Sequence, residues 1–157
     1  MTRRFLLLLS VVSLSGFAQQ SSAPFSIVIS TDHSTVAAGD PVHLNIVFTN
    51  LSDHDIDCGG VASNGLDRAY EYSVVDSSGN VMPKMQRAHP EIGESFSPWP
   101  CTVKPGASAN AAGGLISQLF SFREPGQYTV VVSRRAGGPS GPEISSNPLT
   151  ITVTPPA

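Results

Sequence analysis

A Pro-Gly turn that leads into a β-branched run constrains the fold of this chain more than any other feature. Pro125 and Gly126 stand just before Tyr128 and the Thr-Val-Val-Val run at residues 129–132. Proline fixes φ near the value of a tight turn and glycine accepts positive φ, so the chain reverses before a run that favours a strand. In β-sandwiches, a tyrosine at such a corner buries its ring and bonds its hydroxyl to nearby backbone. We therefore predict that Pro125, Gly126 and Tyr128 form a structural corner.

The N-terminal segment has the pattern of a secretory signal. A basic start containing Arg3 and Arg4 is followed by an apolar run that is too short to span a bilayer. Gly16 and Ala18 supply the small residues that a signal peptidase needs, so we expect residues 1–18 to be removed and residues 19–24 to form a polar spacer. The competing interpretation is an uncleaved amphipathic anchor.

The mature chain would form one domain with no transmembrane segment. Removing 18 of 157 residues leaves 139, which is enough for one core. Loss of two arginines changes the formal charge from −3 to −5. A mildly acidic surface disfavours nonspecific nucleic-acid binding, so nucleic acid is not an expected partner.

The chain has two cysteines, Cys58 and Cys101. An exported protein meets an oxidising compartment, so we predict one disulfide between them. Two free thiols are the alternative. Together with the signal pattern, this prediction places the protein outside the cytoplasm, either secreted or periplasmic.

Alternation of apolar and polar residues predicts most of the strands. It is clearest over residues 25–30, 42–49 and 149–154. A hairpin is expected from residues 69–76 and 81–85 around a polar loop. Residues 56–58 predict a short strand, residues 107–114 a weak one, and residues 115–120 a single helical turn.

Two segments lack any period and are expected to be loops. Residues 86–100 hold three prolines and form a long loop that ends at Cys101, and the glycine-rich residues 134–142 form a second, flexible loop. Short strands, frequent turns and few charges predict an all-β fold. The fold class is an immunoglobulin-like antiparallel β-sandwich of seven to eight strands, covering residues 25–154.

Several segments also resemble a family of bacterial immunoglobulin-like domains. The resemblance rests on Ala-Gly-Asp-Pro-Val at 38–42, Phe-Thr-Asn-Leu-Ser-Asp at 48–53, the hairpin at 72–79, Val-Lys-Pro-Gly at 103–106 and Pro-Gly-Gln-Tyr-Thr-Val at 125–130. It is similar to the intracellular proteinase inhibitor-like family and to the immunoglobulin-like domains that accompany secreted metalloendopeptidases. The resemblance implies the sandwich fold and suggests proteinase inhibition or an accessory role, without assigning an inhibitory residue.

The segment at residues 53–58, Asp-His-Asp-Ile-Asp-Cys, is the densest group of metal-ligand residue types. In an extended segment, Asp53, Asp55 and Asp57 fall on one side while His54 and Cys58 fall on the other, so one ion cannot easily collect them. A solvated acidic strand edge explains the pattern better. We predict neither a metal site nor a cofactor.

The sequence gives no catalytic constellation. It has no Gly-x-Ser-x-Gly motif, and the four histidines are not spaced as partners of a nucleophile. Glu91 and Glu94 could act as an acid and a base, but loop solubility explains them better. We predict no catalytic residues and no enzyme activity.

Phe96 and Trp99 are the candidate partner-contact residues. Trp99 stands between two prolines, which makes it stiff and suited to anchor a protein or glycan contact. The alternative is that its ring packs over the predicted disulfide.

Two shorter motifs carry less information. Asn50 begins a glycosylation sequon. Arg134 and Arg135, at the start of the glycine-rich loop, could invite proteolysis or bind an anion, although a soluble hairpin tip is the simpler interpretation.

These observations predict an exported, non-enzymatic binding module that recognises a protein partner through loops or a strand edge. The alternative is a proteinase inhibitor that acts through the loop at residues 86–101.

Overall fold

The computed structural model describes residues 23–59, 69–85 and 101–156. The predicted signal at residues 1–18 and most of the spacer at residues 19–24 lie outside the described residues. Within the described ranges the protein is almost entirely β-structure, with one short 3-10 helix, η1 (Ile116–Gln118). None of its described helices has the length and apolarity needed to cross a membrane.

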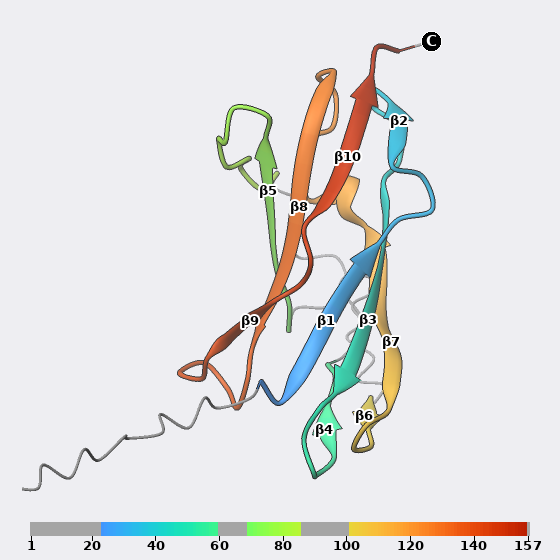
Figure 1. Ribbon diagram of the computed structural model, residues 1–157. Helices are drawn as coiled ribbons and strands as arrows, with labels where there is room; N and C mark the ends of the chain where they lie inside the picture. The colour runs from blue at the N-terminus through green and yellow to red at the C-terminus, as the bar shows by residue number, and fades with distance from the viewer. Residues whose placement is uncertain (1–22, 60–68, 86–100, 157) are drawn as a thin grey trace, which may run out of the picture.

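The smaller of the two main sheets has three antiparallel strands (Figure 1). Its order is β1 (Phe25–Ser30), β3 (His43–Asn50) and β7 (Ser108–Leu115). The pairing of β3 with β7 shifts register between Leu44 and Ile46. Gly113 lies against the Leu44 carbonyl there, where a Cβ atom would collide with backbone, so the glycine permits the close approach of the two strands.

The larger sheet is built around the longest strand, β8 (Gly126–Arg135). Its order is β2 (Thr35–Ala37), β10 (Leu149–Thr154), β8 and β5 (Glu71–Asp76). β9 (Glu143–Ser145) pairs with the last residues of β8, and β2 runs parallel to β10. All other pairs in this sheet are antiparallel. A third, two-stranded sheet joins β4 (Ile56–Asp57) to β6 (Thr102–Val103).

Both main sheets contribute to one hydrophobic core. The buried residues alternate along the strands, as the period of two requires when one face of a sheet is covered. Contributions come from Ile27 in β1, Phe48 in β3, Val74 in β5, Val130 in β8 and Ile151 in β10, each at most 3% exposed.

A short link between β9 and β10 ties the two sheets together. Ser146 belongs to the larger sheet through the bond from its backbone N–H to the Val132 carbonyl, and its Oγ accepts from the Val132 N–H. The next residue, Asn147, binds the smaller sheet: its Oδ1 accepts from the N–H of Ile29 at 2.8 Å and its Nδ2 donates to the Ile29 carbonyl at 3.1 Å. This side chain occupies edge groups of β1 that would otherwise be open to another strand.

The fold prediction is confirmed at the level of an all-β chain with mostly antiparallel sheets. The strands expected from alternation are β1, β3, β5, β7, β8 and β10, and the predicted helical turn is η1. The described residues contain ten strands, whereas seven to eight were predicted. Strands β2, β6 and β9 are only two or three residues long, so they leave no periodic pattern in the sequence.

Two local predictions were wrong. Residues 81–85 do not return as a strand, and only Val81 forms a bridge, with Val75. Arg134 and Arg135 are not in a loop: they are the last two residues of β8 and pair with Ile144 and Glu143. The arginines extend the strand because β9 supplies partners for their backbone groups.

Candidate functional site

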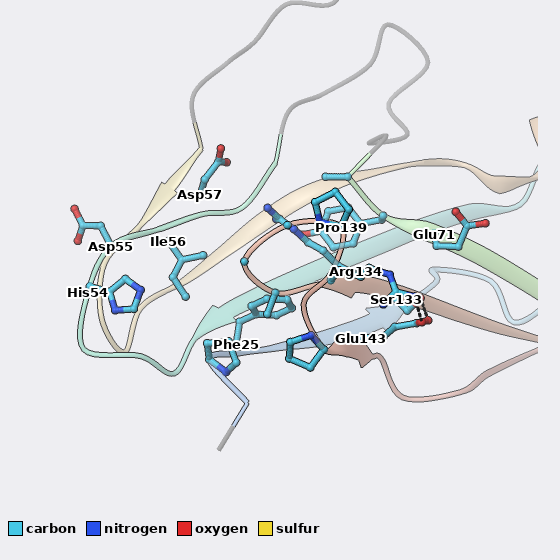
Figure 2. A pocket seen from close by; sticks show the side chains of 18 residues that line it. Phe25, His54, Asp55, Ile56, Asp57, Glu71, Ser133, Arg134, Pro139 and Glu143 are labelled. Carbon is cyan, nitrogen blue, oxygen red and sulfur yellow. Dashed lines mark hydrogen bonds and ion pairs between the residues drawn. The ribbon is translucent and has the colours of Figure 1, made fainter. Parts of the chain in front are cut away.

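A cleft opens at the end of the molecule where β8 finishes and β1 begins. Its cavity volume is about 1220 Å³. Four separate segments line it: residues 24–25, 54–57, 69–71 and 133–143 with gaps. Figure 2 shows Arg134 between residues 54–57, which we call the β4 segment, and a second group formed by Glu71, Ser133 and Glu143.

Strand β8 places the side chain of Arg134 on its core-facing side. Tyr128, Val130 and Val132 are buried on that face, and Arg134 is the next residue in the same period. It therefore occupies the position where the apolar row of the strand reaches the end of the core. The side chain is half-buried, and an arginine can keep its stem against apolar surface there while its head reaches the cleft.

Three aromatic rings surround the guanidinium of Arg134. The Cζ atom lies 5.9 Å from the ring centroid of Phe25, 5.6 Å from that of Phe48 and 5.5 Å from that of Tyr70. Phe25 and Phe48 pack on each other with centroids 4.7 Å apart. These distances are within the range at which a ring face attracts a cation.

The hydrogen bonding of Arg134 is incomplete. Among the described residues, its Nη1 is the one buried side-chain nitrogen or oxygen without a hydrogen-bond partner. No ion pair of the described part of the chain involves it. Buried polar groups in proteins are almost always satisfied, so this donor marks the cleft as a place where an acceptor is missing.

The nearest acid on the neighbouring strand is already engaged. Glu143 accepts a hydrogen bond from the Ser133 hydroxyl at 2.6 Å and pairs with Arg135 at 3.4 Å. Arg135 also donates to the Gly141 carbonyl at 3.2 Å. These contacts fix the turn after β8 on the outer face of the strand and leave Glu143 committed there.

The rim of the cleft carries acidic side chains. Asp55 pairs with Lys104 at 2.6 Å, Glu71 pairs with Lys84 at 2.5 Å, and Asp57 accepts from the N–H of Gly59 at 2.7 Å. His54 lies 2.9 Å from Asp53, and the hydrogen bond from its ring is the main reason why the pKa of Asp53 is lowered. Acidic residues therefore outnumber arginines in the lining of the cleft, and two of them, Asp55 and Glu71, are paired with lysines.

The β4 segment of the rim is held by a disulfide and a buried amide. The predicted bridge between Cys58 and Cys101 is present, with Cα atoms 5.2 Å apart. Asn50 is fully buried: its Nδ2 donates to the carbonyls of His54 and Val103, and its Oδ1 accepts from Ser52. Because this nitrogen is committed to two carbonyls inside the fold, the sequon at Asn50 is not presented by the folded protein.

The predicted structural corner lies at the opposite end of β8. Pro125 precedes the strand, Gly126 begins it, and Tyr128 is buried. The Tyr128 hydroxyl donates to the Glu124 carbonyl at 2.7 Å, and its ring meets Phe122 edge-on at 5.3 Å. Burial, helped by the charges of Glu124 and Asp76, raises the pKa of Tyr128.

The segment at residues 53–58 does not bring its potential metal ligands together. Within the described ranges no group of three or more His, Cys, Asp or Glu residues could hold a metal ion. Cys58 is bonded to Cys101, and the Asp55 carboxylate binds Lys104. Phe96 and Trp99, and the acidic pair Glu91 and Glu94, lie outside the described residues.

Sequence reasoning missed Arg134 as a site residue. The signal was present in the alternation Tyr128, Val130, Val132, Arg134, which puts the arginine on the buried face. The glycines and prolines that follow at residues 137–142 suggested a loop and hid that continuation.

Comparison with known proteins does not add a relative. No protein-family model matches the chain, and no curated protein matches it.

Proposed function

We propose that this chain is an exported, non-enzymatic binding domain that recognises a protein partner with the end that contains the Arg134 cleft. The observation that carries the proposal is the cleft itself, where four segments distant in sequence surround a buried donor without an acceptor. Convergent polar groups in a concave, partly apolar site are typical of recognition sites. The disulfide is compatible with an oxidising compartment and so with export.

We further propose that the two main sheets form an immunoglobulin-like sandwich. The order β1-β3-β7 against β5-β8-β10 agrees with the two sheets of that fold. Tyr128 stands near the start of β8 and bonds backbone four residues upstream, as the corner tyrosine does in such domains. The disulfide differs from the inter-sheet bridge of antibody domains, because it joins the residue after β4 to the residue before β6. In domains of this fold the loops at one end of the sandwich are the usual recognition surface.

Site-specific photo-crosslinking tests where the partner binds. A photoreactive residue replaces exposed Pro139 at the cleft, and in a matched variant it replaces exposed Ser78 at the opposite end of β5. We expect a discrete crosslinked species in the native medium or envelope from the Pro139 variant and none from the Ser78 variant. Crosslinking only at Ser78, or at neither position, would contradict the proposal.

The second candidate function is proteinase inhibition through residues 86–101. Both ends of this segment are tied to the fold: the Met85 N–H donates to the Leu119 carbonyl at 2.8 Å, and Cys101 forms the disulfide. Fixed ends favour a loop that enters a protease cleft, because less freedom is lost on binding.

A panel of secreted proteases separates the two functions. Inhibition that disappears when residues 86–100 are replaced by a Gly-Ser segment of equal length, and that survives Arg134→Met, would favour the inhibitor. Absence of inhibition by the wild-type protein across the panel would remove this candidate and leave the binding domain.

A further inference from the structure

The Arg134 guanidinium is held in place by its neighbours, but its Nη1 has no hydrogen-bond acceptor. Its cationic plane is held against the rings of Phe25, Phe48 and Tyr70, and its stem continues the buried row of β8. These contacts restrict the side chain before any ligand arrives. A donor that is already ordered loses little conformational freedom on binding, which is the condition for a strong anchor.

The fold offers this guanidinium no internal acceptor among the described residues. The carboxylate of Glu143 is bonded to Ser133 and Arg135, and the Tyr70 hydroxyl donates to the Cys58 carbonyl at 3.0 Å. Nη1 of Arg134 therefore stays buried and without an acceptor in the free protein. The Arg134 side chain is only half-buried, so a ligand oxygen that accepts from its guanidinium gains a charge-assisted hydrogen bond without displacing an internal partner.

The charges around the cleft select the kind of anion. Four carboxylates line the cleft against two guanidiniums, so a ligand with several negative charges is less favoured there than one with a single charge. The carboxylates belong to Asp55, Asp57, Glu71 and Glu143, and the guanidiniums to Arg134 and Arg135. A single carboxylate fits the fork geometry of arginine with one negative charge. Basic residues beside that carboxylate would meet the acidic rim favourably.

We propose that Arg134 anchors one carboxylate of the partner protein, an Asp or Glu side chain or a chain terminus, flanked by basic residues. This inference rests on the proposed binding function and names the chemistry that the cleft recognises. Aromatic faces hold the guanidinium, the guanidinium donates to the carboxylate, and the acidic residues of the cleft receive the flanking cations.

The test is a titration of the full mature protein followed by NMR, using the backbone amides and the arginine Nε–H signals. The probe is an acetylated, amidated Lys-Gly-Glu-Gly-Lys peptide, and its matched control has Gln in place of Glu. A third peptide, acetyl-Lys-Gly-Gly-Gly with a free carboxyl end, distinguishes a side-chain carboxylate from a terminal one. Inorganic phosphate is the fourth probe.

We expect the Glu peptide, the free-end peptide or both to bind at least tenfold more tightly than the Gln peptide. The shifts should centre on Arg134 and on amides near Phe25 and Tyr70. In Arg134→Met the preference over Gln should vanish, and in Arg123→Met, a matched variant of an exposed arginine outside the cleft, it should remain. Failure of both the Glu peptide and the free-end peptide to bind more tightly than the Gln peptide, tighter binding of phosphate than of either carboxylate, or unchanged preference in Arg134→Met would each overturn the proposal.

Two features keep the result decisive. If Arg134→Met does not fold, the wild-type comparison of the carboxylate peptides, the Gln peptide and phosphate still decides. Shifts confined to Arg123 or Lys104, which lie outside the cleft, would show surface attraction only and reject the proposal. Failure here is also separable from failure of the proposed function. A crosslink at Pro139 without carboxylate preference rejects only the anchor, whereas no crosslink at Pro139 rejects the binding end itself.

Discussion

The two ends of β8 handle a polar group at the limit of the core in opposite ways. At one end the ring of Tyr128 is buried and its hydroxyl donates a hydrogen bond to the Glu124 carbonyl. At the other end Arg134 lies on the same face of the strand, and its buried Nη1 has no hydrogen-bond partner. A satisfied buried group stabilises a fold, whereas an unsatisfied one lowers stability and is retained where something outside the fold makes use of it. The Tyr128 end therefore has the properties of a structural element, and the Arg134 end is the one that we propose for recognition.

The largest effect is expected from the disulfide that braces the Arg134 end. The bridge joins residues 43 positions apart, and loop-closure entropy for a loop of that size gives roughly 4 kcal/mol. We expect the double variant Cys58→Ala, Cys101→Ala to lose about that much in urea unfolding, with the β4 segment affected first in hydrogen exchange. An unchanged unfolding midpoint would mean that this end does not depend on the bridge.

The next effect concerns Asn50, which fastens the rim segment from inside. Asn50→Ala removes the donors to the His54 and Val103 carbonyls and leaves both without these partners. We expect a loss of about 3 kcal/mol in chemical unfolding. Asn45→Ala is the matched control, because the Asn45 side chain is exposed and, within the described ranges, hydrogen-bonds only to Asp32. If both variants lost equally little, the buried amide would not hold the rim.

Tyr128→Phe should give a smaller loss at the structural end. The ring and its contact with Phe122 remain, and only the hydrogen bond to Glu124 is removed. We expect the free energy of unfolding to fall by about 1 kcal/mol and peptide binding to persist. Loss of binding with an unchanged melting temperature would break the division between the two ends.

Arg134→Met sharpens the comparison of the two ends of β8, because we do not expect this substitution to lower the free energy of unfolding as the others do. Methionine keeps an apolar stem but removes the unsatisfied donor, which typically costs about 1–3 kcal/mol, while the lost cation–π attraction is worth about 0.5–2 kcal/mol. We therefore expect the stability of this variant to stay within about 1 kcal/mol of wild type or to exceed it, as measured by urea unfolding. A loss as large as that of Asn50→Ala would show that Arg134 is a structural plug.

The smallest effect is the acid sensitivity of the turn at the structural end. The hydrogen bond from the Asn80 side chain, followed by the Asn80 N–H, lowers the pKa of Asp76 from its usual range. A carboxylate whose folded pKa is depressed contributes stability above the unfolded pKa and loses it as pH falls through the folded pKa. Carbon-13 titration should place the Asp76 midpoint below that of a free aspartate side chain. Asn80→Ala should raise that midpoint, and an unchanged midpoint would contradict the assignment.

Much of the larger architecture was predictable because burial on one face of a strand writes a period of two into the sequence. The alternation in β3 and β10 needed no tertiary knowledge. By contrast, β2 and β9 are three-residue strands that exist because β10 and β8 offer backbone partners, so their own residues carry no pattern. The return of the predicted hairpin failed because residues 81–85 form a single bridge with β5.

The sequence by itself determined the longer strands, the pairing of Cys58 with Cys101 and the corner that ends in Tyr128, since each depends on neighbouring residues or on there being only two cysteines. The Arg134 site was decided by tertiary structure alone. Its rings come from Phe25 in β1, Phe48 in β3 and Tyr70 just before β5. Local alternation gives the direction of a side chain, but only the packing of two sheets determines where the core stops and what surrounds the last residue.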